Sequence, residues 1–96
     1  MLGVAVLGLG RIGPTHARVV SQTDGVALKA VAEMDEAKLG SVVDGLSDVT
    51  GYGEYRDALA RDDVQVVVIC LPHWLHEQAA IDAAEAGKHI FIEKPP

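Results

Sequence analysis

The sequence predicts an open, doubly wound α/β sheet with five parallel strands in the order 3-2-1-4-5. Short apolar runs alternate with helix-like segments along the whole chain, and this alternation pairs strands in parallel through right-handed crossovers. A glycine turn lies between the first apolar run and the first helical segment, which is typical of such sheets. With 96 residues, 49% of them hydrophobic, the chain is long enough to fold as one domain over residues 1–96.

The strands are predicted from apolar, β-branched runs and the helices from an apolar periodicity of three to four residues. The predicted strands span about residues 2–7, 27–32, 49–52, 64–71 and 89–93. The predicted helices span about residues 12–21, 36–46, 54–61 and 74–86. Pro14 fits the first turn of the first helix, Asp35 is expected to cap the second, and Gly87 is expected to end the fourth. The helix faces expected to pack are Ile12, His16, Val19 and Val20 in the first and Leu75, Ala79, Ala83 and Ala86 in the fourth.

Charge and cysteine content narrow the function classes. Eight basic side chains face fourteen acidic ones, which gives a net charge of −6 and no basic block. We therefore expect neither nucleic acid nor an anionic membrane surface as a partner. Cys70 is the single cysteine and lies in an apolar run, so we expect a small core residue, no disulfide and no metal site. No apolar run approaches the length of a membrane span, and a reducing cytoplasm is the expected location.

The glycine turn has the spacing of a dinucleotide-binding loop. Gly8, Gly10 and Gly13 form a G-x-G-x-x-G pattern between the first predicted strand and the first predicted helix. Gly8 would allow the tight turn, Gly10 would let a pyrophosphate approach the backbone, and Gly13 would let the helix pack on the strand. The free N–H groups of the first helical turn would face the phosphates.

An acid at the end of the second predicted strand supports the same interpretation. Glu33 lies twenty residues after Gly13, where a carboxylate accepts hydrogen bonds from the adenosine ribose hydroxyls. Its negative charge would repel a 2′-phosphate, which favours NAD over NADP. The alternative is a solvated acid in a strand-to-helix loop.

All the candidate site residues lie at carboxyl ends of predicted strands. They fall in residues 8–13, at Glu33, in residues 72–76 and in residues 93–95. The carboxyl ends of parallel strands meet at one edge of the sheet, where such folds bind their ligands. We therefore expect one crevice, near the ends of the first and fourth strands.

Three segments together resemble one family. They are Gly8-Leu-Gly-Arg-Ile-Gly-Pro-Thr-His16, Cys70-Leu-Pro-His-Trp-Leu-His76 and Ala86-Gly-Lys-His-Ile-Phe-Ile-Glu-Lys-Pro95. This combination resembles the glucose–fructose oxidoreductase/inositol dehydrogenase (Gfo/Idh/MocA) family of NAD(P)-dependent oxidoreductases, and specifically its N-terminal Rossmann domain. The closing Glu-Lys-Pro is the most specific of the three segments.

The resemblance implies a role for each matching residue. The pyrophosphate would be held by Gly8, Gly10 and Gly13 and the backbone of Arg11 and Ile12, and the ribose by Glu33. The cofactor wall on the nicotinamide side would be formed by Leu71, Pro72, His73, His76 and Glu93. Lys94 would be the catalytic residue, because an ammonium beside the nicotinamide could stabilise a developing alkoxide.

Plainer roles remain open for several of these residues. His76 would cap or pack the fourth helix, His73 would be an exposed loop residue, and Lys94 would be a solvated lysine near the end of the chain. His16 is expected to pack on the apolar helix face. Trp74 is either a hydrophobic anchor or part of a substrate or subunit surface.

The resemblance covers only the cofactor half of such an enzyme. The sixth strand and the second, substrate-binding domain are absent from residues 1–96, so we expect the chain alone to be inactive. In a longer, homo-oligomeric enzyme the implied reaction is hydride transfer between NAD and a secondary alcohol of a sugar or cyclitol. The alternatives are a standalone nucleotide-binding or regulatory module and, less favoured, a methyltransferase-like domain that binds S-adenosylmethionine.

Overall fold

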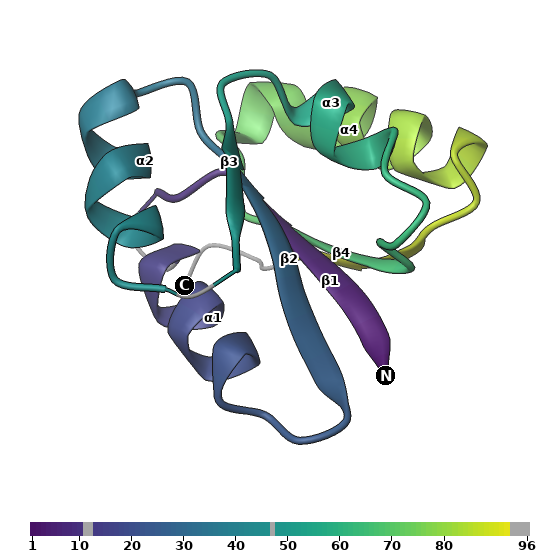
Figure 1. Cartoon of the computed structure of the whole chain (residues 1–96). Helices are drawn as coiled ribbons and strands as arrows, with labels where there is room; N and C mark the ends of the chain where they lie inside the picture. Colours follow the sequence, from purple (N-terminus) through teal and green to yellow (C-terminus); the bar gives the residue numbers. More distant parts are fainter. Residues whose placement is uncertain (11–12, 47, 93–96) are drawn as a thin grey trace.

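Five short strands pair in parallel in the order β3-β2-β1-β4-β5, as the sequence predicts (Figure 1). The computed structural model describes residues 1–10, 13–46 and 48–92. The strands are β1 (Leu2–Leu7), β2 (Val26–Ala32), β3 (Thr50–Tyr52), β4 (Val66–Ile69) and β5 (His89–Ile92). The helices that alternate with them are α1 (Gly13–Ser21), α2 (Glu36–Val43), α3 (Tyr55–Leu59) and α4 (His73–Glu85).

Two layers of helices enclose the sheet, with α1 and α2 on one face and α3 and α4 on the other (Figure 1). The side chains of β1 show why its sequence is apolar throughout. Ala5 and Leu7 pack in the core beneath α3 and α4, whereas Val4 and Val6 pack in the core beneath α1 and α2. Successive residues of a strand point to opposite faces, and a central parallel strand is buried on both.

Two hydrogen bonds hold the amino end of β1 against Gln65, the residue just before β4. The N–H of Gln65 donates to the carbonyl oxygen of Gly3 at 2.8 Å, and the N–H of Gly3 donates to Oε1 of Gln65 at 2.6 Å. A Cβ atom on Gly3 would lie 1.7 Å from the carbonyl oxygen of Asp63. No side chain fits there, so glycine is required for the loop before β4 to cross the end of β1.

Several element boundaries differ from the predicted ones. β4 spans Val66–Ile69 rather than residues 64–71. At its carboxyl end, Cys70 and Leu71 leave the strand and pack against the turn at Gly8. α2 ends at Val43 rather than at residue 46, with Asp44 as its C-cap. On α1 the prediction for Val19 was wrong, because this residue is 52% exposed, whereas Ala17 is fully buried.

Two helix ends confirm the predicted local chemistry. The carboxylate of Asp35 accepts hydrogen bonds from the N–H groups of Ala37 and Lys38 and caps α2. Gly87 has a φ of +76° just after α4, a conformation that glycine adopts readily. Among the helices of the described residues, none has the length and apolar character needed to cross a membrane.

Candidate cofactor site at the carboxyl edge of the sheet

The turn after β1 is built around a close approach at Gly8. Gly8 has a φ of +86°, and a Cβ atom there would lie 2.8 Å from both the N and the Cα of Leu71. The N–H of Gly8 donates to the carbonyl oxygen of Ala32 at 2.7 Å, and the N–H of Cys70 donates to that of Leu7 at 2.7 Å. The carboxyl ends of β1, β2 and β4 therefore meet at this glycine.

Gly10 leaves one side of the turn open. Among the described residues, a Cβ atom on Gly10 would meet only the carbonyl oxygen of Cys70, at 3.4 Å. The helix α1 then begins at Gly13, so its first N–H groups follow directly after the turn. An open glycine backed by a helix start is a suitable place for a phosphate group. Arg11 and Ile12, which the sequence also assigns to this site, lie outside the described residues.

Glu33 makes two contacts that the sequence did not reveal. Its Oε1 accepts a hydrogen bond from the N–H of Leu9 at 2.8 Å, and its Oε2 accepts one from the N–H of Asp35 at 2.9 Å. Its own N–H donates to the carbonyl oxygen of Tyr52 at the end of β3. The half-buried acid therefore joins the glycine turn to the loop between β2 and α2.

The predicted wall follows β4 and continues into α4. Leu71 is buried against the glycine turn, and Pro72 is the N-cap of α4 without a side-chain hydrogen bond. His73 and His76 lie one turn apart on α4, with ring centroids 5.8 Å apart and planes tilted by 48°. Trp74, between them, is 73% exposed, so this edge of the sheet carries a large uncovered aromatic surface.

Two further predicted site residues, like Arg11 and Ile12, lie outside the described part of the chain. They are Glu93 and Lys94, which follow β5, so the catalytic role of Lys94 stays a prediction.

His16, on α1, has its ring centroid 6.2 Å from that of Phe91 in an edge-to-face arrangement. In the described part of the chain, no group of three or more His, Cys, Asp or Glu side chains is arranged to hold a metal ion.

Two pairs of polar side chains interact strongly outside the predicted cofactor site. Burial, together with the hydrogen bond to Asp82, raises the pKa of Tyr55 to about 12. The hydrogen bond from Tyr55 in turn lowers the pKa of Asp82. Arg61 donates to both carboxylate oxygens of Asp63 at 2.7 Å, which raises the pKa of Arg61 and lowers that of Asp63. These contacts join α3 to α4 and fix the loop before β4, and they are structural.

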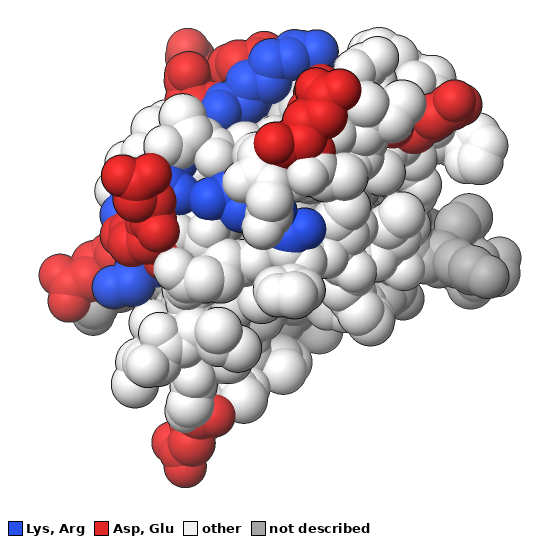
Figure 2. All heavy atoms as spheres, turned by 90° about the vertical axis from the view of Figure 1, so that its right-hand side faces the viewer, with Lys and Arg blue, Asp and Glu red and all other residues white. Residues whose placement is uncertain are grey.

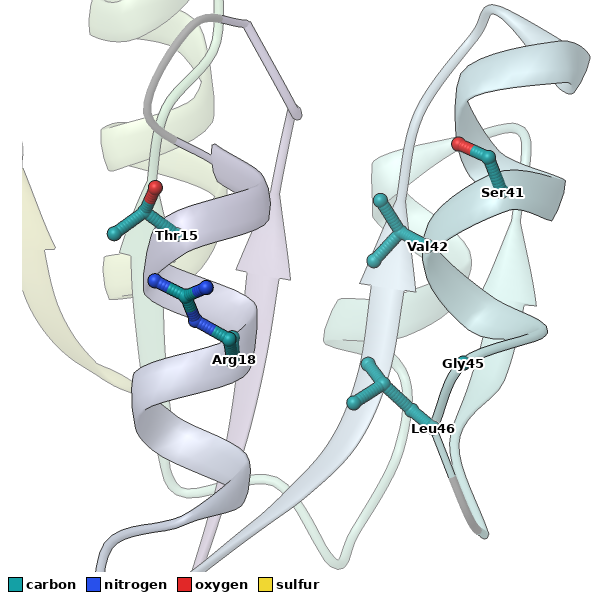
Figure 3. A pocket seen from close by; sticks show the side chains of 6 residues that line it. All are labelled: Thr15, Arg18, Ser41, Val42, Gly45 and Leu46. Atoms are coloured by element: carbon teal, nitrogen blue, oxygen red, sulfur yellow. The ribbon is translucent and has the colours of Figure 1, made fainter.

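A groove between α1 and α2 is separate from the glycine turn. It has a volume of about 330 Å³ and is lined by Thr15, Arg18, Ser41, Val42, Gly45 and Leu46. Figure 3 shows the side chains of Val42, from α2, and of Leu46, just after α2, directed towards α1, where Arg18 extends along the helix towards Thr15. Of the predicted cofactor-site residues that the structure describes, none lines this groove.

Comparison with known proteins identifies the family. Residues 2–96 match the family model for the Gfo/Idh/MocA oxidoreductases, described as "Oxidoreductase family, NAD-binding Rossmann fold". The chain belongs to this family. The match confirms the resemblance drawn from the three sequence segments, and it includes the glycine turn and Glu33.

Individual relatives are much longer than this chain. An uncharacterised oxidoreductase of Bacillus subtilis, YrbE, is 36% identical over 90 residues, which cover 94% of this chain and 26% of the relative. A probable dehydrogenase from Thermotoga maritima superimposes with a TM-score of 0.92 at 32% identity, over 98% of this chain and 28% of that one. A scyllo-inositol dehydrogenase from Lactobacillus casei, solved with bound NAD(H) and scyllo-inositol, gives 0.91 at 29% identity, over 99% and 28%. The chain therefore spans about a quarter of the length of these relatives.

Proposed function

We propose that this chain is the NAD-binding part of an oxidoreductase that transfers hydride between NAD and a secondary alcohol of a sugar or cyclitol. The observation that carries the proposal is the turn at Gly8 and Gly10, which is open at Gly10 and has Glu33 beside it. The family match supports the cofactor, and the Lactobacillus casei scyllo-inositol dehydrogenase supports the substrate class.

The residues fit a dinucleotide along this edge. The turn of Gly8, Gly10 and Gly13 would hold the pyrophosphate, with backbone N–H groups of Arg11 and Ile12. Glu33 would accept the hydroxyls of the adenosine ribose. The wall on the nicotinamide side would consist of Leu71, Pro72, His73 and His76, with Glu93 nearby. When bound, the nicotinamide supplies the hydride chemistry, and Lys94 would hold the proton of the substrate hydroxyl.

The position of Glu33 favours NAD over NADP. Backbone N–H groups hold each of its oxygens, and we expect the 2′-hydroxyl of the ribose to bind beside this carboxylate. A 2′-phosphate there would meet a negative charge at short range. We therefore expect weaker binding of NADP than of NAD.

Catalysis would need parts of a longer protein. Hydride transfer requires the substrate carbon to be held against the nicotinamide, and positioning supplies much of the rate. The described residues offer a binding edge for the cofactor, but the relatives are about four times as long. We propose that the 96-residue chain alone is inactive, that the longer enzyme is a homo-oligomer, and that it works in the cytoplasm.

Calorimetric titration of the 96-residue chain with NAD, NADP and S-adenosylmethionine tests the proposal. We expect NAD to bind more tightly than NADP, and Glu33→Ala to weaken NAD binding at least tenfold, since about two hydrogen bonds are lost. Glu36→Ala, on the first turn of α2, removes the same charge nearby and should leave NAD binding unchanged. Preferential binding of S-adenosylmethionine would favour a methyltransferase-like domain instead. A folded chain that binds none of the three would contradict the proposal.

A further inference from the structure

The carboxylate of Glu33 accepts hydrogen bonds from two separate loops of the site. Leu9 and Asp35 belong to different loops and lie 24 and 2 residues from Glu33 in the sequence, yet their N–H groups donate to the two oxygens of the same carboxylate. The contact to Leu9 is 2.8 Å and the contact to Asp35 is 2.9 Å. Hydrogen bonds to an ionised acceptor are stronger than those between neutral groups.

Leu9 is the middle residue of the first G-x-G of the turn. Its side chain is fully buried in the core beneath α1 and α2, and its N–H points to Glu33. Gly8, immediately before it, has the positive φ and the close contact with Leu71. The turn is therefore held on one side by the backbone of Leu71 and on the other by the carboxylate of Glu33.

We propose that Glu33 is a positioning residue for the glycine turn, separately from any contact that it makes to a ribose. This inference rests on the proposed function, because the turn that it positions is the proposed pyrophosphate site. A carboxylate oxygen has two lone pairs. Each oxygen of Glu33 can therefore keep the hydrogen bond that it accepts from a backbone N–H group and also accept one from a ribose hydroxyl. Both roles can operate together.

Positioning of the turn by Glu33 changes the cofactor preference expected of a Glu33 variant. If Glu33 acted only by attracting hydroxyls and repelling a 2′-phosphate, its removal would weaken NAD binding and improve NADP binding. Because Glu33 also positions the turn, its removal weakens the binding of every ligand that places a pyrophosphate there. The gain expected for NADP is then offset by a turn that no longer presents its N–H groups in one arrangement.

Two nucleotides separate the two roles. ADP carries both ribose hydroxyls, and 2′,3′-dideoxy-ADP carries neither but has the same pyrophosphate. We expect Glu33→Ala to weaken ADP binding about hundredfold and dideoxy-ADP binding still about tenfold, one charge-assisted hydrogen bond corresponding to roughly that factor. Glu33→Gln keeps one acceptor oxygen at the same distance and should recover part of the loss with dideoxy-ADP. Glu36→Gln should change neither affinity.

Equal binding of dideoxy-ADP to the parent chain and to Glu33→Ala would overturn the inference. Amide hydrogen exchange without ligand provides an independent measurement. Glu33→Ala should accelerate exchange of the Leu9 and Asp35 N–H groups at least tenfold, while N–H groups at the middle of β1 keep their rates. Unchanged exchange at Leu9 would also overturn it. If the folded chain binds neither nucleotide, the proposed function fails, and the exchange rates still decide whether Glu33 positions the turn.

Discussion

At the scale of single residues, Gly8 shows how one missing side chain brings the site together. Its hydrogen atom faces the backbone of Cys70 and Leu71, where a Cβ atom would lie 2.8–2.9 Å from three backbone atoms. Backbone cannot move away as the end of a flexible side chain can. The positive φ of +86° adds a second requirement for glycine at the same position.

We predict that Gly8→Ala destabilises the fold by about 3 kcal/mol, because it combines a left-handed backbone with an overpacked contact. Urea unfolding followed by circular dichroism measures the loss, and NAD binding should disappear with it. Gly53→Ala is the matched control, since a Cβ atom there meets nothing within 4 Å among the described residues. That variant should be unchanged or slightly more stable. A Gly8→Ala chain as stable as the control would contradict this account of the turn.

The sequence predicts some of these residue roles and not others. The glycine spacing predicts the turn because its residues are neighbours in the chain, and the cap at Asp35 is local for the same reason. The bond from Leu9 to Glu33 spans 24 residues and depends on the register of β1 against β2. No pattern within either segment marks that contact, so Glu33 could be predicted only as a ligand-facing or solvated acid.

At the scale of elements, a polar cluster joins the two helices on the far face from α1. The hydroxyl of Tyr55 on α3 donates to Asp82 on α4 at 2.5 Å. The side-chain amide of Gln78 also donates to Oδ1 of Asp82 at 2.9 Å. Nε of Arg56 lies 3.3 Å from Oδ2 of the same carboxylate. Because α3 has only five residues, it is too short to be stable by itself. Its position depends on the buried Tyr55, Ala58 and Leu59 and on this cluster.

Tyr55→Phe should lower the melting temperature at neutral pH by about 5 °C, the effect of one lost hydrogen bond in a domain of this size. The difference between the two chains should narrow as the pH falls below about 4, because the lowered pKa of Asp82 stabilises the fold only while that carboxylate is ionised. It should also narrow between about pH 10 and about 12. Over that range the unfolded chain loses the Tyr55 proton while the folded chain, with its raised pKa, retains it.

Thermal unfolding of both chains across this pH range checks the prediction. A difference that stays constant from acid to alkaline pH would show that the Tyr55–Asp82 bond contributes nothing to stability. Arg18, which is exposed on α1, offers a control position. Arg18→Lys should leave the pH dependence unchanged.

The elements themselves were largely predictable, and their packed faces less so. Apolar periodicity located all the helices and strands that the structure describes to within a few residues. It wrongly placed Val19 and Ala86 among the packed residues, since Val19 is 52% exposed and Ala86 is also exposed. Periodicity gives the direction of a helix face but not where the neighbouring layer ends. Ala86 lies at the C-cap of α4, after the helix has passed its buried Ala79 and Ala83.

At the scale of the whole molecule, the strand order was predictable, and the two edges of the sheet differ. β3 is a short edge strand of three residues, whereas β5 presents three large apolar side chains. Ile90, Phe91 and Ile92 are 37%, 52% and 40% exposed. Figure 2, which faces the side on the right of Figure 1, shows charged side chains along the top and the left side and a broad uncharged area over the middle. Unprotected apolar edges promote pairing between chains.

We therefore predict that the 96-residue chain self-associates through β5 as its concentration rises. Ile90→Lys should reduce the association at least tenfold, because a lysine on an edge strand opposes pairing with another chain. The control is Ile81→Lys on α4, because Ile81 is 45% exposed and Ile90 is 37% exposed. This variant should leave association unchanged. Light scattering across a concentration series measures both. A parent chain that stays monomeric at high concentration would contradict the prediction.

The central position of β1 has a consequence for how the chain folds as it is made. β1 is synthesised before both strands that pair with it, β2 on one side and β4 on the other. Gly3 of β1 also contacts Gln65, the residue just before β4 and 62 residues away in the sequence. β1 and β2 can associate early, but the other side of β1 stays uncovered until β4 has been translated. Such late, long-range pairing slows folding and prolongs the time in which a nascent chain can misassemble. Delayed completion of the middle of the sheet is thus built into the strand order.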